Sequence, residues 1–361
     1  MASSQAEPRV RERRSEVRRQ PSVRSRVLAL LVGITIITVL AVGFLGVRSV
    51  QSTGESARDV SADALRFQAQ EYLRQVTTGD VQRSDLVLVG VARDAETVAE
   101  YAGRIFESPD TFQNGDYWRA EDHMFVASDG QYMNSEEDVS SAYVPAYVDV
   151  DDETLQALEL GAYCDLVFAP TFEGDENTVA IYLGTEHQTT QYHPNIGLGN
   201  LVGPDFTVTE RPWYVSASPE NNPDGEVVWS SVYVDATGKG LMVTAAAPVY
   251  ASGDFVGAVG LDVTLDAIAA SVQETRLLGS GYGFLIDDQG QAIALPEDGY
   301  RDILGRDPQP DEVGADLTGS ETAFASLLAD MMAGGKGFET LNVGDRDLYV
   351  AYAPLSATGW S

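Results

Sequence analysis

Cysteine, lysine and histidine are scarce in this sequence of 361 residues. The single cysteine, Cys164, has no partner for an internal disulfide, so packing has to stabilise the fold. Lysine occurs only as Lys239 and Lys336. The sequence also lacks a nucleophile elbow, a phosphate-binding glycine loop and a zinc-binding spacing, so we expect no enzyme activity, no metal and no cofactor.

Basic residues are few, whereas acidic residues are abundant. The first 26 residues contain eight arginines and three glutamates, so the other 335 contain 52 acidic and 15 basic residues, a net charge of −37 (15 − 52). Nucleic acids and anionic lipids bind basic patches, which makes both poor partners for this part of the chain. We favour a solvated acidic surface, as in salt-tolerant proteins, over a binding function of the acidic residues.

One long apolar run stands near the N-terminus. Val27 to Val47 comprises 21 residues without a charge, which as a helix is long enough to cross a bilayer. The basic arm before it, with a net charge of +5 (8 − 3), is expected to stay in the cytoplasm. A cleavable signal peptide is the alternative, but such peptides have a shorter apolar core and a small-residue cleavage site. We therefore predict a single-pass membrane protein whose residues 48–361 lie outside the cytoplasm.

The rest of the chain is too long for one small core, which indicates two modules. From Arg48 to Phe106 apolar residues recur at helical spacing, and Ser108-Pro109 ends the pattern. A bend is expected at Gly79-Asp80. We predict the following divisions: a basic arm (1–26), a transmembrane helix (27–47), a long stalk helix (48–108), a first module (109–264) and a second module (265–361).

Short β-type runs separated by glycine and aspartate turns follow the stalk helix. Met124 to Met133 and Tyr282 to Ile293 have the same hairpin layout, which indicates a duplicated module. Further strands are expected at 178–182, 227–234, 241–250, 255–263, 337–341 and 346–353, and helices at 265–278 and 321–332. Asp149 to Glu153 is expected to begin a helix and not to bind calcium. The fold class is therefore α+β with antiparallel sheets.

This layout and four motifs resemble the double Cache (dCache_1) sensor domain of prokaryotic chemoreceptors and sensor histidine kinases. The motifs are Thr209-Glu-Arg-Pro-Trp-Tyr214, Tyr233-Val-Asp-Ala-Thr-Gly238, Ala246-Ala-Pro-Val249 and Gly257-Ala-Val-Gly-Leu-Asp262. The resemblance implies two PAS-like modules along the long helix, with a membrane-distal one that binds ligand and a membrane-proximal one. It also implies a homodimer with contacts along the stalk helix, and a function in signal transduction such as chemotaxis.

In amino-acid-binding members of that family, the motifs supply the ligand-binding side chains. Carried over to this sequence, these are Arg211, Trp213, Tyr214, Tyr233, Asp235 and Asp262. A guanidinium suits the carboxylate of an amino acid, and carboxylates and aromatic faces suit its ammonium group. Arg211 would take the carboxylate, and the other five would enclose the ammonium.

Four of these residues could instead have a purely structural role. Arg211 could tie down a loop, Trp213 and Tyr214 could be core aromatics, and Asp235 could stabilise a turn. Asp262 ends an apolar strand, where a carboxylate needs a cation or donors. Where the family often has a tyrosine before the arginine, this chain has Phe206, which cannot hydrogen-bond. An amine is therefore the second ligand class, and a carboxylate or a purine would require a different pocket.

The sequence disfavours two other classes of protein. A tethered solute-binding protein would have two α/β lobes with parallel strands, which the hairpins disfavour. An extracytoplasmic enzyme would need a paired acid and base or a metal. In relatives the chain continues after the position of Ser361 into a second membrane helix and an output domain, so we expect a chemotaxis, kinase, cyclase or phosphatase module beyond it.

Overall fold

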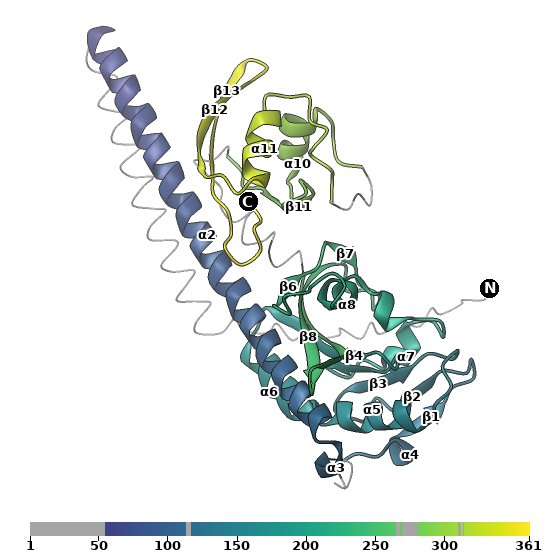
Figure 1. Ribbon diagram of the computed structural model, residues 1–361. Coiled ribbons are helices and arrows are strands. Elements are labelled where there is room, and N and C mark those ends of the chain that lie inside the picture. The colour runs from purple at the N-terminus through teal and green to yellow at the C-terminus, as the bar shows by residue number, and fades with distance from the viewer. Residues whose placement is uncertain (1–54, 113–116, 265–267, 269–280, 310–311, 313) are drawn as a thin grey trace, which may run out of the picture. The chain divides into compact units, whose positions relative to one another are not determined.

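A computed structural model describes residues 55–112, 117–264, 268, 281–309, 312 and 314–361 (Figure 1). The predicted transmembrane helix at 27–47 lies outside these residues, as does the predicted helix at 265–278 except for Ile268. Within the described part of the chain, none of the helices has the length and apolar character that crossing a bilayer requires.

The long helix α2 spans Glu55–Glu107 and confirms the predicted stalk helix. It runs without interruption past Gly79 and Asp80, so the predicted bend there is wrong. Glycine weakens a helix by only about 1 kcal/mol relative to alanine, and the tertiary packing of the following turns outweighs this cost. A short helix, α3 (Pro109–Phe112), follows after Ser108.

Residues 120–264 form a nine-stranded antiparallel sheet with helices on both faces (Figure 1). The strands follow the order β1-β2-β3-β5-β4-β9-β8-β6, and β7 also pairs with β8. Their bounds are β1 Met124–Val126, β2 Tyr132–Asn134, β3 Ser141–Val144, β4 Thr178–Thr185, β5 Thr190–His193, β6 Val228–Trp229, β7 Tyr233–Val234, β8 Leu241–Ala251 and β9 Asp254–Thr264. The helices are α4 Ala120–His123, α5 Asp152–Ala162, α6 Asp165–Gly174, α7 Leu198–Leu201, η1 Val208–Glu210 and α8 Pro212–Ala217.

Most predicted strands of this region are confirmed, with one difference. The hairpin at 124–133 forms as β1 and β2, which are paired antiparallel. The strand expected at 227–234 is two short strands, β6 and β7, that pair with different parts of β8. Helix α5 starts where the acidic run predicted, because the side chain of Asp151 accepts a hydrogen bond from the Thr154 amide (2.9 Å) and caps the helix.

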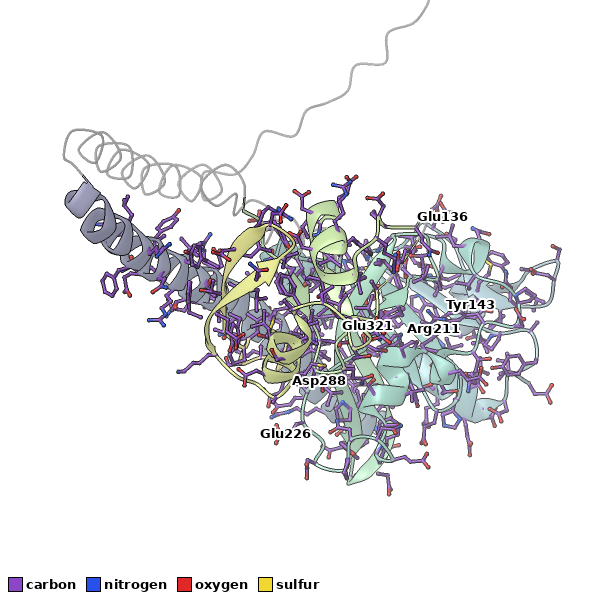
Figure 2. All side chains as sticks on the ribbon, turned by 90° about the horizontal axis from the view of Figure 1, so that it is seen from above. Glu136, Tyr143, Arg211, Glu226, Asp288 and Glu321 are labelled. Carbon is purple, nitrogen blue, oxygen red and sulfur yellow. The ribbon has the colours of Figure 1, made fainter. Side chains whose placement is uncertain are left out.

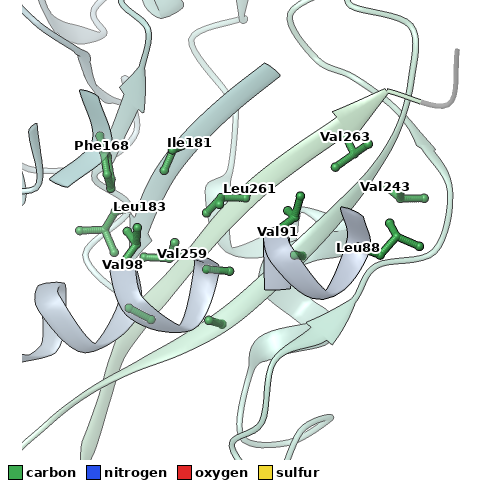
Figure 3. Packing of buried hydrophobic residues seen from close by; sticks show 14 of the residues in the cluster. Leu88, Val91, Val98, Phe168, Ile181, Leu183, Val243, Val259, Leu261 and Val263 are labelled. Atoms are coloured by element: carbon green, nitrogen blue, oxygen red, sulfur yellow. The ribbon is translucent and has the colours of Figure 1, made fainter. Parts of the chain in front are cut away.

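One face of the sheet packs on α2 and α6. Apolar residues of α2, among them Leu88, Val91 and Val98, meet Val243 of β8 and Leu261 of β9 (Figure 3). The helix approaches the sheet closely at Gly103, where a Cβ atom would lie 2.6 Å from the carbonyl oxygen of Tyr250. Because strand residues alternate between the two faces, this core leaves the opposite face of β8 and β9 free for other contacts.

The C-terminal region, residues 281–361, has a separate core. It contains β10 Leu285–Ile286, β11 Ala292–Ala294, α10 Glu297–Gly299, η2 Tyr300–Leu304, α11 Ala325–Met332, β12 Gly337–Val343 and β13 Arg346–Tyr352. The strands form two antiparallel pairs, β10 with β11 and β12 with β13. Ile286, Ile303, Phe324 and Leu327 are fully buried between these elements. The second predicted hairpin and the last helix and strands are confirmed, the helix starting four residues later than expected.

Acidic side chains lie on the surface of both regions. Figure 2 labels Glu136, Glu226, Asp288 and Glu321, all of which are exposed. Their solvation agrees with the interpretation of the acidity as a property of the surface.

Candidate ligand-binding site

A small cavity of about 30 Å³ lies on the face of the sheet opposite α2. Residues of β4, β5, β7 and β9 and of the segment from α7 to α8 line it, together with a turn after β7. The lining residues are Tyr182, Thr190, Tyr192, Leu198, Phe206, Val208, Arg211, Trp213, Tyr233, Asp235, Ala236, Thr237 and Asp262. A water molecule needs a cavity of roughly 10–15 Å³, so in this conformation the cavity holds only small groups.

The strand register brings residues that are far apart in the sequence to this face. In β4, Ala180, Tyr182 and Gly184 point the same way, since alternate residues of a strand share a face. Ala180 pairs with Asp262 of β9, and Gly184 pairs with Thr190 of β5.

Two glycines make room for the aromatic rings of the site. A Cβ atom on Gly260 would lie 2.2 Å from the ring of Tyr182. A Cβ atom on Gly184 would lie 2.6 Å from Val208 and 2.9 Å from the ring of Trp213. Glycine in a strand often marks such a close approach, and here it allows large rings to lie flat over the sheet.

The carboxylate of Asp262 is buried, with 1% of the residue exposed, and is bonded on one side only. Its Oδ1 accepts hydrogen bonds from the hydroxyls of Tyr182, Thr244 (2.7 Å) and Tyr233 (3.2 Å). Its Oδ2 is buried and has no hydrogen-bond partner among the described residues. Because a buried carboxylate oxygen without a partner is costly, Asp262 is prepared for a donor or a cation that the described residues do not supply.

Burial also determines the protonation of this cluster. It raises the pKa of Asp262 to about 6, although the hydrogen bonds from Tyr182 and Thr244 act in the opposite direction. Burial and the nearby charge of Asp262 raise the pKa values of Tyr182 and Tyr233 well above the usual range. At neutral pH the two phenols therefore remain donors, and the carboxylate is ionised.

The local sequence positions Arg211 at the mouth of the site. It precedes Pro212, the first residue of α8, and has extended backbone angles (φ −71°, ψ 142°), as expected for a residue before proline. Its guanidinium carbon lies 5.7 Å from the ring centre of Phe206 and 5.6 Å from that of Tyr233. Among the described residues, the guanidinium makes one hydrogen bond, and it is long, 3.5 Å to the carbonyl oxygen of Val234. Phe206 in turn packs edge-on against Tyr143. The guanidinium thus keeps donors available for an anion.

The turn at 235–240 forms one wall of the cavity. The Oδ2 atom of Asp235 accepts hydrogen bonds from the amides of Thr237 and Lys239, both 3.0 Å, so this carboxylate organises the turn. The ammonium of Lys239 donates to Tyr192 Oη and to the carbonyl oxygen of Val179, both at 2.8 Å. It also lies over the ring of Tyr192, 5.1 Å from the ring centre. Lys239 therefore ties the turn to β4 and β5.

Five of the six predicted site residues line one cavity: Arg211, Trp213, Tyr233, Asp235 and Asp262. Tyr214 does not line it; its ring packs edge-on against Phe255, 5.8 Å away. Trp213 and Tyr214 are consecutive residues of a helix, about 100° apart around its axis, so they face different surroundings.

Sequence reasoning missed Tyr182, Thr190, Tyr192, Lys239 and Thr244. The first three lie in strands that lack a recognisable motif. Only the strand register, which pairs Tyr182 with Tyr192 and Thr190 with Gly184, assigns them to the site. A usable signal was the alternation in β4, where Ala180, Tyr182 and Gly184 share one face. Lys239 gave a weaker signal, as one of only two lysines in the chain.

Comparisons with known families match two overlapping parts of the chain. Residues 151–270 match the family described as the first PDC sensor domain of methyl-accepting chemotaxis protein-like proteins. Residues 224–359 match the double sensory domain of two-component sensor kinases, dCache_3, a double Cache type as the motifs predicted. Both matches are to sensor domains, and together they cover residues 151–359.

Among curated proteins, the chain is similar to methyl-accepting chemotaxis proteins. It is 24% identical over 175 residues to McpC of Bacillus subtilis, which is 48% of this chain and 26% of that protein. It is 40% identical over 89 residues to McpA of Pseudomonas putida, 24% of this chain and 13% of that protein. The chain thus spans about a quarter or less of the length of these two relatives.

A solved structure shares the fold. The extracellular domain of a putative histidine kinase, mmHK1S-Z2, superposes with a TM-score of 0.51 at 13% sequence identity, over 81% of this chain and 95% of that one. The chain is thus similar in sequence to methyl-accepting chemotaxis proteins, and it shares its fold with the extracellular domain of a putative histidine kinase.

Proposed function

We propose that the chain is the extracytoplasmic sensor of a chemotaxis-type receptor and binds an α-amino acid in the cavity between Asp262 and Arg211. The observation that carries this proposal is the unpartnered Oδ2 of Asp262, buried among aromatic rings. An ammonium group satisfies such an oxygen with both charge and a hydrogen bond. The similarity to methyl-accepting chemotaxis proteins supports the receptor class.

Each end of the ligand has its own group of residues. The ammonium binds Asp262, with the rings of Trp213 and Tyr233 around it, and the carboxylate binds Arg211. The two rings beside Arg211 hold its guanidinium in place without consuming its donors. Asp235 acts through the turn that it organises, and Tyr214 supports the position of α8 from the far side.

The arrangement in the cell follows from the sequence. We infer that the apolar segment 27–47 crosses the membrane, that residues 48–361 lie outside the cytoplasm, and that two copies associate through α2. The module at 109–264 is then the membrane-distal, ligand-binding module, and the module at 265–361 is the proximal one. Ligand shifts the receptor between two conformations by its difference in affinity for them.

A binding panel tests the ligand class. The full chain in detergent is titrated calorimetrically with α-amino acids, simple amines and simple carboxylates at pH 8. We expect binding of at least one α-amino acid and no binding of carboxylates that lack an ammonium group. Binding of carboxylates alone would contradict the role of Asp262.

Substitution of Arg211 separates amino acids from amines. Arg211→Ala should weaken amino-acid binding by about 10-fold or more, since a charge-assisted hydrogen bond contributes roughly 1.5–3 kcal/mol. It should leave amine binding unchanged. Arg301→Ala is the matched control, because that arginine is bound to surface acids of the C-terminal region. If the wild-type protein binds amines as tightly as amino acids, the second ligand class applies.

A further inference from the structure

The C-terminal region lines a second and larger cavity, of about 590 Å³. Residues 281–285, helix α11 and strand β13 line it, together with residues of α2 between Leu73 and Ser84. All of these residues belong to one compact unit, Ala69–Ser361. Small-molecule sites are typically cavities of roughly 300–1,000 Å³, so this cavity has room for a small organic ligand.

Five aromatic rings line this cavity, those of Tyr282, Phe284, Phe324, Tyr349 and Tyr352. In the part of the chain that the structure describes, arginines lie over the rings of Tyr300 and Phe338, but none lies over any of these five. The face of an aromatic ring attracts cations, most strongly where water is excluded. The cavity therefore offers several rings to a cationic ligand group.

The buried hydrogen-bonding groups of the cavity are mostly occupied. The hydroxyl of Tyr282 and the guanidinium of Arg346 both donate to Asp302. Of the buried side-chain polar atoms that line it within the described residues, only Oγ of Ser361 lacks a partner. The cavity thus has few open acceptors for the N–H groups of a primary ammonium, whereas a quaternary ammonium has no N–H group to satisfy.

The charged residues that line the cavity are mostly acidic: Asp80, Asp298, Asp302 and Asp347, beside Arg346. Arg346 pairs with Asp302. Asp80 and Asp298 pair with arginines that do not line the cavity. Among the described residues Asp347 has no basic partner, and its Oδ1 accepts a hydrogen bond from the neutral side chain of Asn342 (3.1 Å). Asp347 therefore gives the cavity an uncompensated negative charge.

We propose that this cavity is a second ligand-binding site, and that its ligand is a small organic cation with a quaternary ammonium group. The methyl groups of the cation contact the rings of Tyr282, Phe284 and Tyr349, and Asp347 supplies the opposite charge. A hydroxyl elsewhere on the ligand pairs with Oγ of Ser361. The proposal is independent of the proposed function, because none of these residues lines the cavity at Asp262.

Choline and its neutral isostere 3,3-dimethylbutan-1-ol separate the effect of charge from that of size. The two molecules have the same shape and the same hydroxyl, and only choline is charged. The full chain in a non-ionic detergent is titrated with each by calorimetry at pH 8 and constant ionic strength. We expect choline to bind about 10-fold or more tightly than the alcohol. Equal binding of the two, or no binding of choline, would overturn the proposal.

The variant Asp262→Asn determines which cavity holds the cation. Choline should bind this variant as tightly as the wild type, because a quaternary ammonium has no N–H group to donate to Oδ2 of Asp262. The cavity at Asp262, about 30 Å³, is also too small for it. Loss of choline binding in Asp262→Asn would place the cation in the first module and would contradict the second site.

Tyr349→Leu removes a ring from the cavity and keeps an apolar side chain. It should weaken choline binding by about 5-fold or more. Tyr117→Leu is the matched control, because both tyrosines are stacked on another ring, Tyr349 on Phe338 (5.9 Å between ring centres) and Tyr117 on Tyr163 (5.0 Å). The same choline affinity in Tyr349→Leu and Tyr117→Leu would show that the cation is not bound in this cavity.

A charge variant tests the site without a change in packing, since the side chain of Asp347 is exposed. Asp347→Asn should weaken choline binding by about 2-fold or more at low ionic strength. Asp345→Asn is the control, because Asp345 is also exposed in the β12–β13 hairpin but does not line the cavity. Equal affinities of these two variants for choline would contradict the contact with Asp347.

Discussion

Two buried aspartates, one in each region, show how different the same side chain becomes with different partners. Asp302 of the C-terminal region is 5% exposed and Asp262 is 1% exposed. Both oxygens of Asp302 are bonded within the chain, Oδ1 to the guanidinium of Arg346 (2.5 Å) and Oδ2 to the hydroxyl of Tyr282 (3.2 Å). Asp262 receives hydroxyl donors on one oxygen only.

This difference in partners distinguishes the structural carboxylate of Asp302 from the carboxylate of Asp262, which can still bind a ligand. Arg346 supplies the charge that Asp302 needs, so that pair is complete. Cavity volume alone would have placed the binding site at Asp302. The cavity lined by Asp302 and Arg346 measures about 590 Å³, whereas the cavity at Asp262 measures about 30 Å³. An open polar atom in an aromatic enclosure is the more informative sign of a binding site.

The largest effect that this comparison predicts is on ligand binding. Asp262→Asn removes the charge and should weaken amino-acid binding by at least about 100-fold, since a charged pair and its hydrogen bond are both lost. Titration calorimetry at pH 8 measures the dissociation constant. Asp302→Asn is the matched control and should bind as the wild type does. An equal loss of affinity in the two variants would show that Asp262 is not the ligand-binding carboxylate.

The second prediction concerns pH. Because burial raises the pKa of Asp262 to about 6, the carboxylate is mostly protonated at pH 5 and binding should be about 10-fold weaker there than at pH 8. A midpoint near pH 4 would mean that Asp262 is not the group that controls binding.

The same shift has a consequence for stability. A carboxyl whose pKa is higher in the folded than in the unfolded chain binds its proton more tightly when folded. Its contribution to stability therefore falls as pH rises from about 3.8 to about 6, by about 3 kcal/mol, and is constant above that window. Urea unfolding of the wild type and Asp262→Asn at pH 4 and pH 8 should show the variant gaining stability relative to the wild type at the higher pH.

The third prediction concerns stability, for which Asp302 should matter more than Asp262. Asp302→Asn should lower the free energy of unfolding by about 1–2 kcal/mol, because it weakens the hydrogen bond from Arg346. Asp262→Asn at pH 8 should not lower it. Urea denaturation followed by circular dichroism gives both values, and a greater loss in Asp262→Asn would assign the structural role to Asp262 instead.

The smallest effect is expected from Lys239. Its positive charge acts to lower the pKa of Asp262, so Lys239→Met should move the pH midpoint of binding upwards. Lys336→Met is the matched control, since this exposed lysine lies in the C-terminal region. A midpoint that moves equally in both variants, or in neither, would show that Lys239 only ties down the turn.

The sequence predicted the elements better than their mutual positions. Helical spacing along α2 and the glycine turns between strands are local signals, so the long helix, both hairpins and most strands are confirmed. The motif residues Arg211, Trp213, Tyr233, Asp235 and Asp262 do meet at one cavity. Alternation along β4 was a usable signal for Tyr182. The participation of Thr190 could not be predicted from the sequence, because it depends on which residue of β4 pairs with which residue of β5. The sequence did not predict that Tyr214 faces away from the cavity. The motif contains both Trp213 and Tyr214, but it does not specify which side of the helix each residue occupies.

Strand β8 touches both the site and the long helix, one backbone thickness apart. Thr244 faces Asp262, while its neighbours Val243 and Ala245 belong to the core that contains α2. Further along the same strand, the carbonyl of Tyr250 abuts Gly103 with no side chain between them. Such bare backbone contact has no soft rotamers to absorb a shift. A displacement of β8 on the face of the site is thus transmitted directly to α2 on the other face.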